Sequence, residues 1–186
     1  MAAMPKFMLL AVLALLAACR SDPIQFHTLT PAQMNGATRG HGADIQIEGL
    51  SVPPQVDRPQ IVIRQGNSGL AILETDWWAA SLVDELRSAL ADQLANSAPR
   101  QKVSVRLDVQ RFDSIPGQYA LIDVQWRLRS AGDGDNTLLS CHSTLRTPSG
   151  PTVDELVIAQ QGNVKRLAEL ISQAANGNRK TCPPAS

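Results

Sequence analysis

Two stretches of alternating hydrophobicity constrain the fold of this chain more than any other feature of its sequence. Apolar side chains occupy every second position over residues 103–109 and again over residues 122–128, with polar side chains between them. A period of two is typical of strands that bury one face of a sheet and expose the other. We expect a turn over residues 113–117 between these strands and a third strand over residues 137–147, which together form an antiparallel meander with one face in water.

Shorter strands are predicted in the first half of the chain. Residues 24–29 and 43–48 alternate apolar and polar side chains, as half-buried strands do. Residues 60–64 and 70–73 flank a turn of Gly, Asn and Ser, which predicts a hairpin.

Two amphipathic helices complete the predicted order of elements. The first runs from Thr75 or Asp76 to about residue 96. Its apolar positions recur every four residues, as in a helix with one buried side: Trp78, Leu82, Leu86, Leu90 and Leu94. Its charged positions are expected to face water: Asp84, Glu85, Arg87 and Asp92. The second helix covers residues 152–175 and opens with a Thr-Val-Asp-Glu capping box.

These elements indicate an α+β fold, with a mostly antiparallel mixed sheet and two amphipathic helices packed on one face of it. We assign them to a single domain over residues 24–175, because a chain of this size can bury about 70% of its unfolded surface in one core. Residues 176–186 then form a C-terminal tail.

The N-terminal segment has the pattern of an export signal. Residues 7–18 are an apolar run, too short for the roughly 20 residues that span a bilayer but typical of a signal peptide, which we assign to residues 1–18. The run ends in Leu-Ala-Ala-Cys, which resembles the lipobox of bacterial lipoproteins; the alternative is a chance cysteine beside an ordinary cleavage site. The lipobox implies an acylated Cys19 and a short tether over residues 19–23. Because residue 20 is Arg rather than Asp, it also implies sorting to the outer membrane, facing the periplasm.

The chain has three cysteines. If Cys19 carries lipid, Cys141 and Cys182 remain as an even pair, and the periplasm permits disulfides. A bridge between them would fasten the tail to the strand that carries Cys141, and the chain-entropy model gives about 4 kcal/mol for a loop of roughly 40 residues. The alternative is two unpaired thiols, with Cys141 as a small core residue.

Charge and motifs argue against several functional classes. The 17 Lys and Arg residues balance the 17 Asp and Glu residues, whereas a nucleic-acid-binding protein needs a basic face. The three histidines lack the spacing of a zinc site, and Ser68 lies in a predicted hairpin turn rather than a nucleophile elbow. We therefore predict a protein that is not an enzyme and that holds no metal or cofactor.

The three tryptophans have different expected places. Trp78 and Trp126 fall on apolar stripes, which predicts that both pack in the core. Trp77 neighbours Trp78 but lies about 100° further around the predicted helix. It is therefore a candidate for an exposed partner-binding surface; the alternative is a tryptophan covered by a loop.

Several short segments together resemble one known family. They are Leu16–Cys19 followed by Phe26–Leu29, then Val52–Pro54, Asp57–Val62, Asp76–Leu82, and Phe112 with Trp126–Leu128. The family is that of the PqiC/YmbA-type lipoproteins, also called ABC-type transport auxiliary lipoprotein components, and the resemblance runs from residue 19 to about 175. The chain departs from the family pattern at Ala80-Ser81, where Glu-Pro is frequent. The resemblance implies structural roles for four residues: Arg58, Pro59, Trp78 and Trp126.

The resemblance implies a role in transport rather than a reaction. Family members act as outer-membrane partners of MCE-type proteins, which carry lipid across the periplasm, so we expect an auxiliary or docking component of a PqiAB-like complex. One alternative is a lipid-binding carrier, which would need a concave apolar cavity. Another is an envelope lipoprotein with an unrelated partner. An assembly of several copies is compatible with a tubular partner, and no nucleic acid is expected.

Overall fold

The computed structural model describes residues 22–32, 42–95, 102–130, 137–177 and 181–184. Its elements follow in the order β1 (Gln25–His27), β2 (Asp44–Ser51), β3 (Gln60–Gln65), β4 (Gly69–Trp78), α2 (Leu82–Leu94), β5 (Lys102–Ile115), β6 (Tyr119–Ser130), β7 (Thr137–Pro148) and α3 (Val153–Asn176). The predicted signal peptide and Cys19 lie outside the described residues.

The larger sheet has four strands in the order β2-β5-β6-β7. β5, β6 and β7 pair antiparallel, and β2 lies parallel to β5. The apolar positions of the alternating stretches are all buried: Val103, Val105, Leu107, Val109, Ile122, Val124, Trp126 and Leu128. The predicted meander is confirmed.

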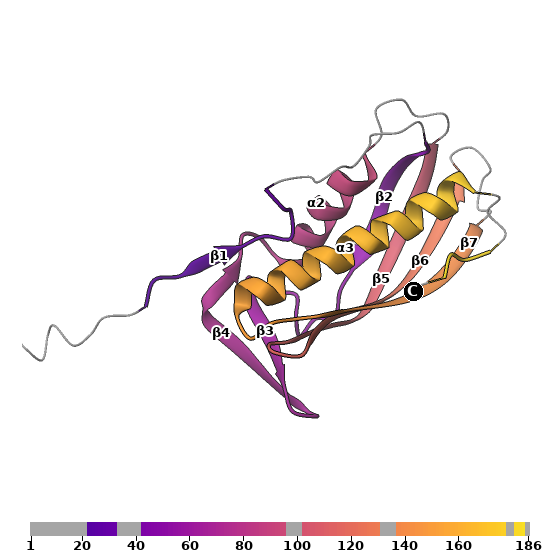
Figure 1. Ribbon diagram of the computed structural model, residues 1–186. Coiled ribbons are helices and arrows are strands. Elements are labelled where there is room, and N and C mark those ends of the chain that lie inside the picture. Colours follow the sequence, from indigo (N-terminus) through magenta and orange to yellow (C-terminus); the bar gives the residue numbers. More distant parts are fainter. Residues whose placement is uncertain (1–21, 33–41, 96–101, 131–136, 178–180, 185–186) are drawn as a thin grey trace, which may run out of the picture.

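The smaller sheet has three strands in the order β1-β4-β3. β3 and β4 form the predicted hairpin, whose far end projects away from the rest of the chain (Figure 1). β1 pairs parallel with the last residues of β4. At this end Trp78 packs edge-on against Phe112 of β5, with ring centroids 6.4 Å apart, so the two sheets meet in the core.

The helices α2 and α3 lie side by side over one face of the four-stranded sheet (Figure 1). α2 covers β2, and α3 covers β6 and β7. Their buried apolar side chains join the sheet side chains in one core cluster: Leu82, Leu86, Ala89, Leu90, Leu94, Val157, Val164, Leu167, Ala168, Leu170, Ile171, Ala174 and Ala175.

The α+β prediction is therefore confirmed, with the difference that the strands form two sheets rather than one. The reason is the position of β4. It pairs with β1 on one side and with β3 on the other, so both of its hydrogen-bonding edges are used. β2 pairs with β5 instead.

The predicted start of the first helix is wrong. Trp77 and Trp78 belong to β4, where they pair with β1, and the helix begins at Leu82. Ser81 is its N-cap, with a side chain that accepts a hydrogen bond from the backbone N–H of Asp84 at 3.3 Å. Trp78 fitted the apolar spacing of the helix only because it is also buried, although it lies on strand β4.

The predicted turn at residues 113–117 is also placed too early. β5 continues to Ile115, and the turn covers residues 116–118, where Gly117 takes a positive φ of 74°. Asp113 therefore lies within the strand, with only 4% of its surface exposed.

The C-terminal tail is joined to β7. Cys141, buried on β7, forms a disulfide with Cys182, which lies 41 residues later in the chain. The pairing brings residues 181–184 against the strand that carries Cys141.

Candidate functional site

The most distinctive site of the molecule is the junction of β1 with β4, α2 and α3. β1 is the first described strand, so it connects the N-terminal segment to the folded domain. Sequence alternation predicted only a half-buried strand here. In the structure the expected sides are reversed: the apolar residues Ile24 and Phe26 are exposed, and the side that carries His27 is bound to the domain by polar contacts.

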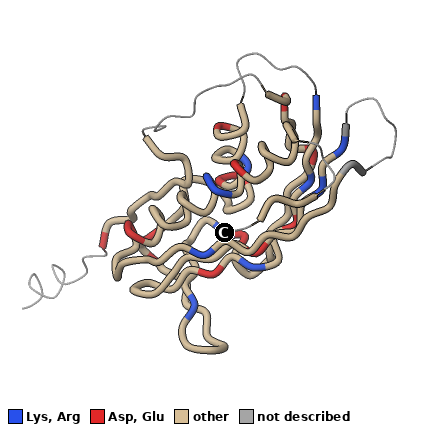
Figure 2. The backbone as a smooth tube through the Cα atoms, turned by 45° about the vertical axis from the view of Figure 1, so that its right-hand side comes forward, with Lys and Arg blue, Asp and Glu red and all other residues tan. Residues whose placement is uncertain are grey.

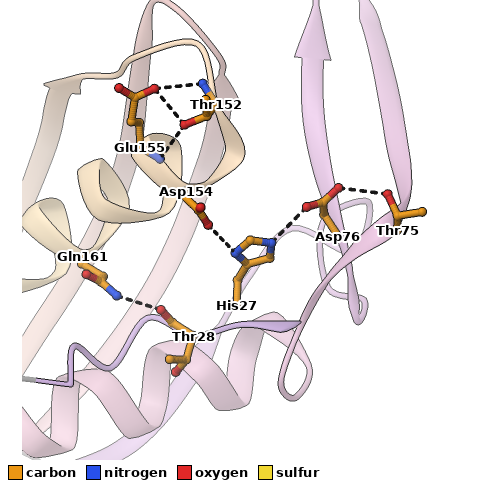
Figure 3. Close-up of polar contacts among 8 residues, drawn as sticks. All are labelled: His27, Thr28, Thr75, Asp76, Thr152, Asp154, Glu155 and Gln161. Atoms are coloured by element: carbon orange, nitrogen blue, oxygen red, sulfur yellow. Dashed lines mark hydrogen bonds and ion pairs between the residues drawn. The ribbon is translucent and has the colours of Figure 1, made fainter. Parts of the chain in front are cut away.

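His27 binds β1 to two other elements (Figure 3). Its Nε2 atom lies 3.0 Å from Oδ1 of Asp76 on β4, and its Nδ1 atom lies 3.4 Å from Oδ1 of Asp154 on α3. The His27 side chain is only 7% exposed, whereas that of Asp154 is 80% exposed. The imidazole ring is thus placed between two carboxylates, one shielded and one in water.

The two residues after His27 are held by Glu85 of α2. One oxygen of its carboxylate accepts hydrogen bonds from the Thr28 hydroxyl and from the Leu29 backbone N–H, both at 2.8 Å. Gln161 of α3 donates to the Thr28 carbonyl at 2.9 Å (Figure 3). The prediction that Glu85 faces water is wrong: it is 6% exposed, and its carboxylate satisfies the backbone N–H of the buried Leu29.

The opposite side of β1 exposes apolar side chains. Ile24 is 46% exposed and Phe26 is 66% exposed. Phe26 packs edge-on against Trp77 of β4, with ring centroids 6.4 Å apart. Ile24, Phe26 and Trp77 are called the β1 patch below. Exposed aromatic clusters of this kind are enriched where proteins bind partners.

Trp77 was predicted to be an exposed candidate for partner binding. In the structure it is half-buried on a strand, and its indole N–H donates to the Glu74 carbonyl at 3.0 Å. Its neighbour Phe26 is more exposed than Trp77. The sequence pattern did not identify Phe26 as a candidate for partner binding. The sheet register, which sets Phe26 opposite Trp77, is what brings them together.

The segments that carried the family resemblance also meet at this junction. The Pro59 carbonyl accepts a hydrogen bond from the Trp78 backbone N–H at 2.6 Å. Asp57 accepts one from the backbone N–H of Val83, at the start of α2, at 3.3 Å. Arg58 is half-buried between these contacts. The Arg-Pro segment thus binds to the end of β4 and the start of α2 through main-chain and carboxylate groups.

A capping box orients the first turn of α3 beside His27. Thr152 accepts from the backbone N–H of Glu155, and the Glu155 carboxylate accepts from the backbone N–H and the hydroxyl of Thr152 (Figure 3). These hydrogen bonds, first from the backbone and then from the side chain, lower the pKa of Glu155. Asp154, the neighbour of Glu155 on this turn, is thereby presented to His27.

Within the described ranges, no group of three or more His, Cys, Asp or Glu side chains could hold a metal ion. In the part of the chain that the structure covers, no helix has the length and apolarity needed to cross a membrane. Basic and acidic positions are interspersed along the described chain in the view of Figure 2.

The His27 cluster was missed at the sequence level. Its members lie 49 and 127 residues apart along the chain, so no local motif marks them. The only available signal was that His27 lies within an alternating run and within the family segment Phe26–Leu29.

Two solved structures have a fold similar to that of this chain. One solved structure, of an uncharacterized protein, superposes with a TM-score of 0.63 at 15% identity, covering 82% of this chain and 98% of that chain. A second, of a Xanthomonas campestris protein of the DUF330 family, has a TM-score of 0.58 at 19% identity, covering 83% of this chain and 94% of that chain. At these identities the likeness shows a shared fold. No curated protein matches the sequence.

The family follows from the sequence. Residues 27–172 match the model of the ABC-type transport auxiliary lipoprotein component, and the chain belongs to this family. The matched range begins at His27 and contains both sheets from that residue onward, with both helices as far as residue 172. It is a family of transport auxiliary lipoproteins rather than of enzymes.

Proposed function

We propose that this chain is an outer-membrane lipoprotein, acylated at Cys19 and facing the periplasm, that docks an MCE-type, PqiB-like protein of an intermembrane lipid-transport complex. Family membership supports the auxiliary role in ABC-type transport. The finer assignment rests on the lipobox-like sequence before Cys19, on Arg20 after it, and on the geometry of β1.

The single observation that carries the proposal is the two-sided β1 strand close to the proposed lipid anchor. Ile24 follows Cys19 by five residues, so even a fully extended chain spans at most about 18 Å between them. His27 and Glu85 fasten the inner side of the strand to the domain. The β1 patch is therefore held to the domain at a short distance from the proposed lipid anchor. A partner protein that extends across the periplasm would meet the patch close to the outer membrane.

The packing favours a docking role over a carrier role. Buried apolar side chains between the two helices and the four-stranded sheet form one large core cluster, with a smaller one of Ala120, Leu156 and Ala159 beside it. The largest of them, Trp126, is 1% exposed. A carrier would instead need concave apolar volume for acyl chains.

Replacing the proposed lipid attachment site tests the anchor. In the Cys19→Ala variant we expect a protein that is released from the membrane fraction or remains unprocessed, because the chain then lacks the acyl groups that would anchor it. Fractionation and intact mass measure this. Unchanged attachment of a processed Cys19→Ala protein would refute the anchor.

Co-purification from membranes in mild detergent tests the docking surface. We expect an MCE-domain protein to be recovered with the wild-type chain and to be lost from a Phe26→Ser, Trp77→Ser variant. Leu70→Ser is the matched control, since Leu70 is 45% exposed on the projecting hairpin and outside the β1 patch. Recovery of the partner with the double variant, or its loss only with Leu70→Ser, would move the interface elsewhere. Recovery of bound phospholipid without any MCE-domain protein would favour the carrier.

A further inference from the structure

A second polar feature of the structure is a cleft at the turn between β5 and β6, with lining residues separate from those of the β1 junction. It lies between the β3–β4 hairpin and the turn that joins β5 to β6, and its volume is about 550 Å³. Arg64 and Asn67 line it from the hairpin side, and Arg111, Gln118 and Tyr119 line it from the other side. We propose that this cleft binds the phosphate of an anionic phospholipid head group. The proposal builds on the proposed role in lipid transport.

Two arginines converge on one buried carboxylate beneath the cleft. Arg64 donates to Oδ1 of Asp113 from Nε at 3.1 Å and from Nη2 at 2.9 Å. Arg111 donates from Nη2 to the other oxygen, Oδ2. The Asp113 side chain is 5% exposed, whereas those of Arg64 and Arg111 are 28% and 51% exposed. The carboxylate thus fixes both guanidinium groups while leaving part of each in the cleft.

The charges in this cluster do not cancel. Asp113 and Asp123 carry two negative charges against the guanidinium groups of Arg64, Arg111 and Arg146, which leaves one positive charge around the cleft. Asp123, which stands opposite Arg111 on β6, interacts with His142. Arg146 lies 3.9 Å from the centroid of the Tyr119 ring, so a third guanidinium stands behind a lining residue. A partly shielded excess of positive charge favours an anionic ligand.

Guanidinium geometry favours phosphate as the anion. Each guanidinium has five N–H donors. Asp113 takes donors from two nitrogens of Arg64 and from one nitrogen of Arg111, so N–H groups remain on both side chains for a second planar or tetrahedral anion. Phosphate oxygens accept such paired donors well.

The size and polarity of the cleft favour a head group over a bare ion. A volume of about 550 Å³ lies within the range of small-molecule sites and exceeds what one phosphate fills. The amides of Asn67 and Gln118 and the Tyr119 hydroxyl supply polar groups around the arginines. These groups suit the hydroxyls of a glycerophosphate better than they suit an acyl chain.

Calorimetric titration of the full processed protein in non-ionic detergent with water-soluble head groups tests the proposal. The probes are glycerophosphoglycerol, glycerophosphocholine and inorganic phosphate, with an oligoglutamate peptide as a further anionic probe. We expect glycerophosphoglycerol to bind more tightly than the other probes, and added salt to weaken its binding. In Arg111→Gln we expect its affinity to fall about tenfold or more, as for the loss of a charge-assisted hydrogen bond.

Three comparisons keep this test specific. In Arg111→Gln the buried Asp113 still accepts hydrogen bonds from Arg64. Circular dichroism checks that this variant is folded. Arg111→Lys keeps the positive charge but lacks the planar guanidinium with its paired N–H donors. We therefore expect its affinity for glycerophosphoglycerol to lie between those of the wild type and Arg111→Gln. Arg127→Gln removes an exposed arginine from β6, outside the cleft, and should bind like the wild type.

The outcomes separate the possible ligands. Arg111-dependent binding of inorganic phosphate, as tight as that of glycerophosphoglycerol, would assign the cleft to free phosphate. Arg111-dependent binding of an oligoglutamate peptide, without head-group binding, would overturn the lipid assignment in favour of an acidic protein segment. Absence of binding, or equal binding to Arg111→Gln, would overturn the anion site itself. Membrane attachment and partner co-purification of Arg111→Gln, measured in parallel, show whether the docking proposal stands independently.

Discussion

Trp126 is a residue of the alternating pattern whose side chain links β6 to β7 in the core. It lies on β6 opposite Leu107 of β5 and Cys141 of β7, and it is 1% exposed. Its indole N–H donates to the hydroxyl of Ser143 at 3.0 Å, so the one polar atom of a buried ring is satisfied.

Trp126→Ala is expected to lower the free energy of unfolding by about 3–5 kcal/mol, because it leaves a cavity the size of a tryptophan in a closely packed core. Urea unfolding followed by circular dichroism measures the loss. Trp126→Phe is the control, since it retains an aromatic ring and removes the hydrogen bond. A loss below about 1 kcal/mol for the alanine variant would show that the ring is not a core residue.

The sequence predicted burial correctly for apolar residues and poorly for charged ones. Trp126 and Trp78 are buried, as their positions in apolar stripes predict. Glu85 and Asp113 are buried against expectation. A carboxylate is buried only when partners are present to satisfy it. For Glu85 these partners are Thr28 and Leu29, which are remote in the chain. For Asp113 they are Arg111 on the same strand and the remote Arg64.

Among the elements, α3 has the start that the sequence marks most clearly. Thr152 and Glu155 form the predicted capping box, which depends only on residues within one turn. The start of α2 was mistaken, although Ser81 and Asp84 form a comparable local signal. The apolar spacing that continues back to Trp78 concealed it, because a buried strand residue and a buried helix residue look alike in such a pattern.

Thr152→Ala is expected to lower the free energy of unfolding by about 1 kcal/mol near neutral pH, as for the loss of an N-cap. The folded-state pKa of Glu155 is lowered by Thr152. Its contribution to stability is therefore present above the unfolded pKa of the carboxyl and is lost as pH falls through the folded pKa. We expect the difference between wild type and variant to shrink over this acidic window.

Thermal unfolding at a series of pH values measures this effect. Glu155→Gln is the matched variant, because it keeps an acceptor at the same position and removes the titration. A difference between wild type and Thr152→Ala that stays constant down to the most acidic pH would show that the cap does not act through the Glu155 carboxylate.

For the whole molecule, the disulfide between Cys141 and Cys182 joins the C-terminal tail covalently to β7. Cys182→Ser is expected to lower the free energy of unfolding by about 4 kcal/mol, because the unfolded chain regains the entropy of a 41-residue separation. Comparison of unfolding curves with and without reductant measures the same effect in the wild type.

Alkylation before reduction, followed by mass spectrometry, checks the bond directly. Neither Cys141 nor Cys182 should be labelled. Full labelling of both residues would establish free thiols, and a stability unaffected by Cys182→Ser would then be expected.

The sequence by itself determined the elements of the fold whose causes are local. Alternation with a period of two specified the strands of the meander, and a capping box within one turn specified the start of α3. Tertiary structure alone decided which strands became neighbours. β4 took β1 and β3 as partners and so divided the strands into two sheets. Strand pairing, the burial of Glu85 and Asp113 and the clustering of His27 with its carboxylates all depend on groups far apart in the chain. Periodicity reports which face of a segment is apolar, but it carries no information about which distant segment meets that face.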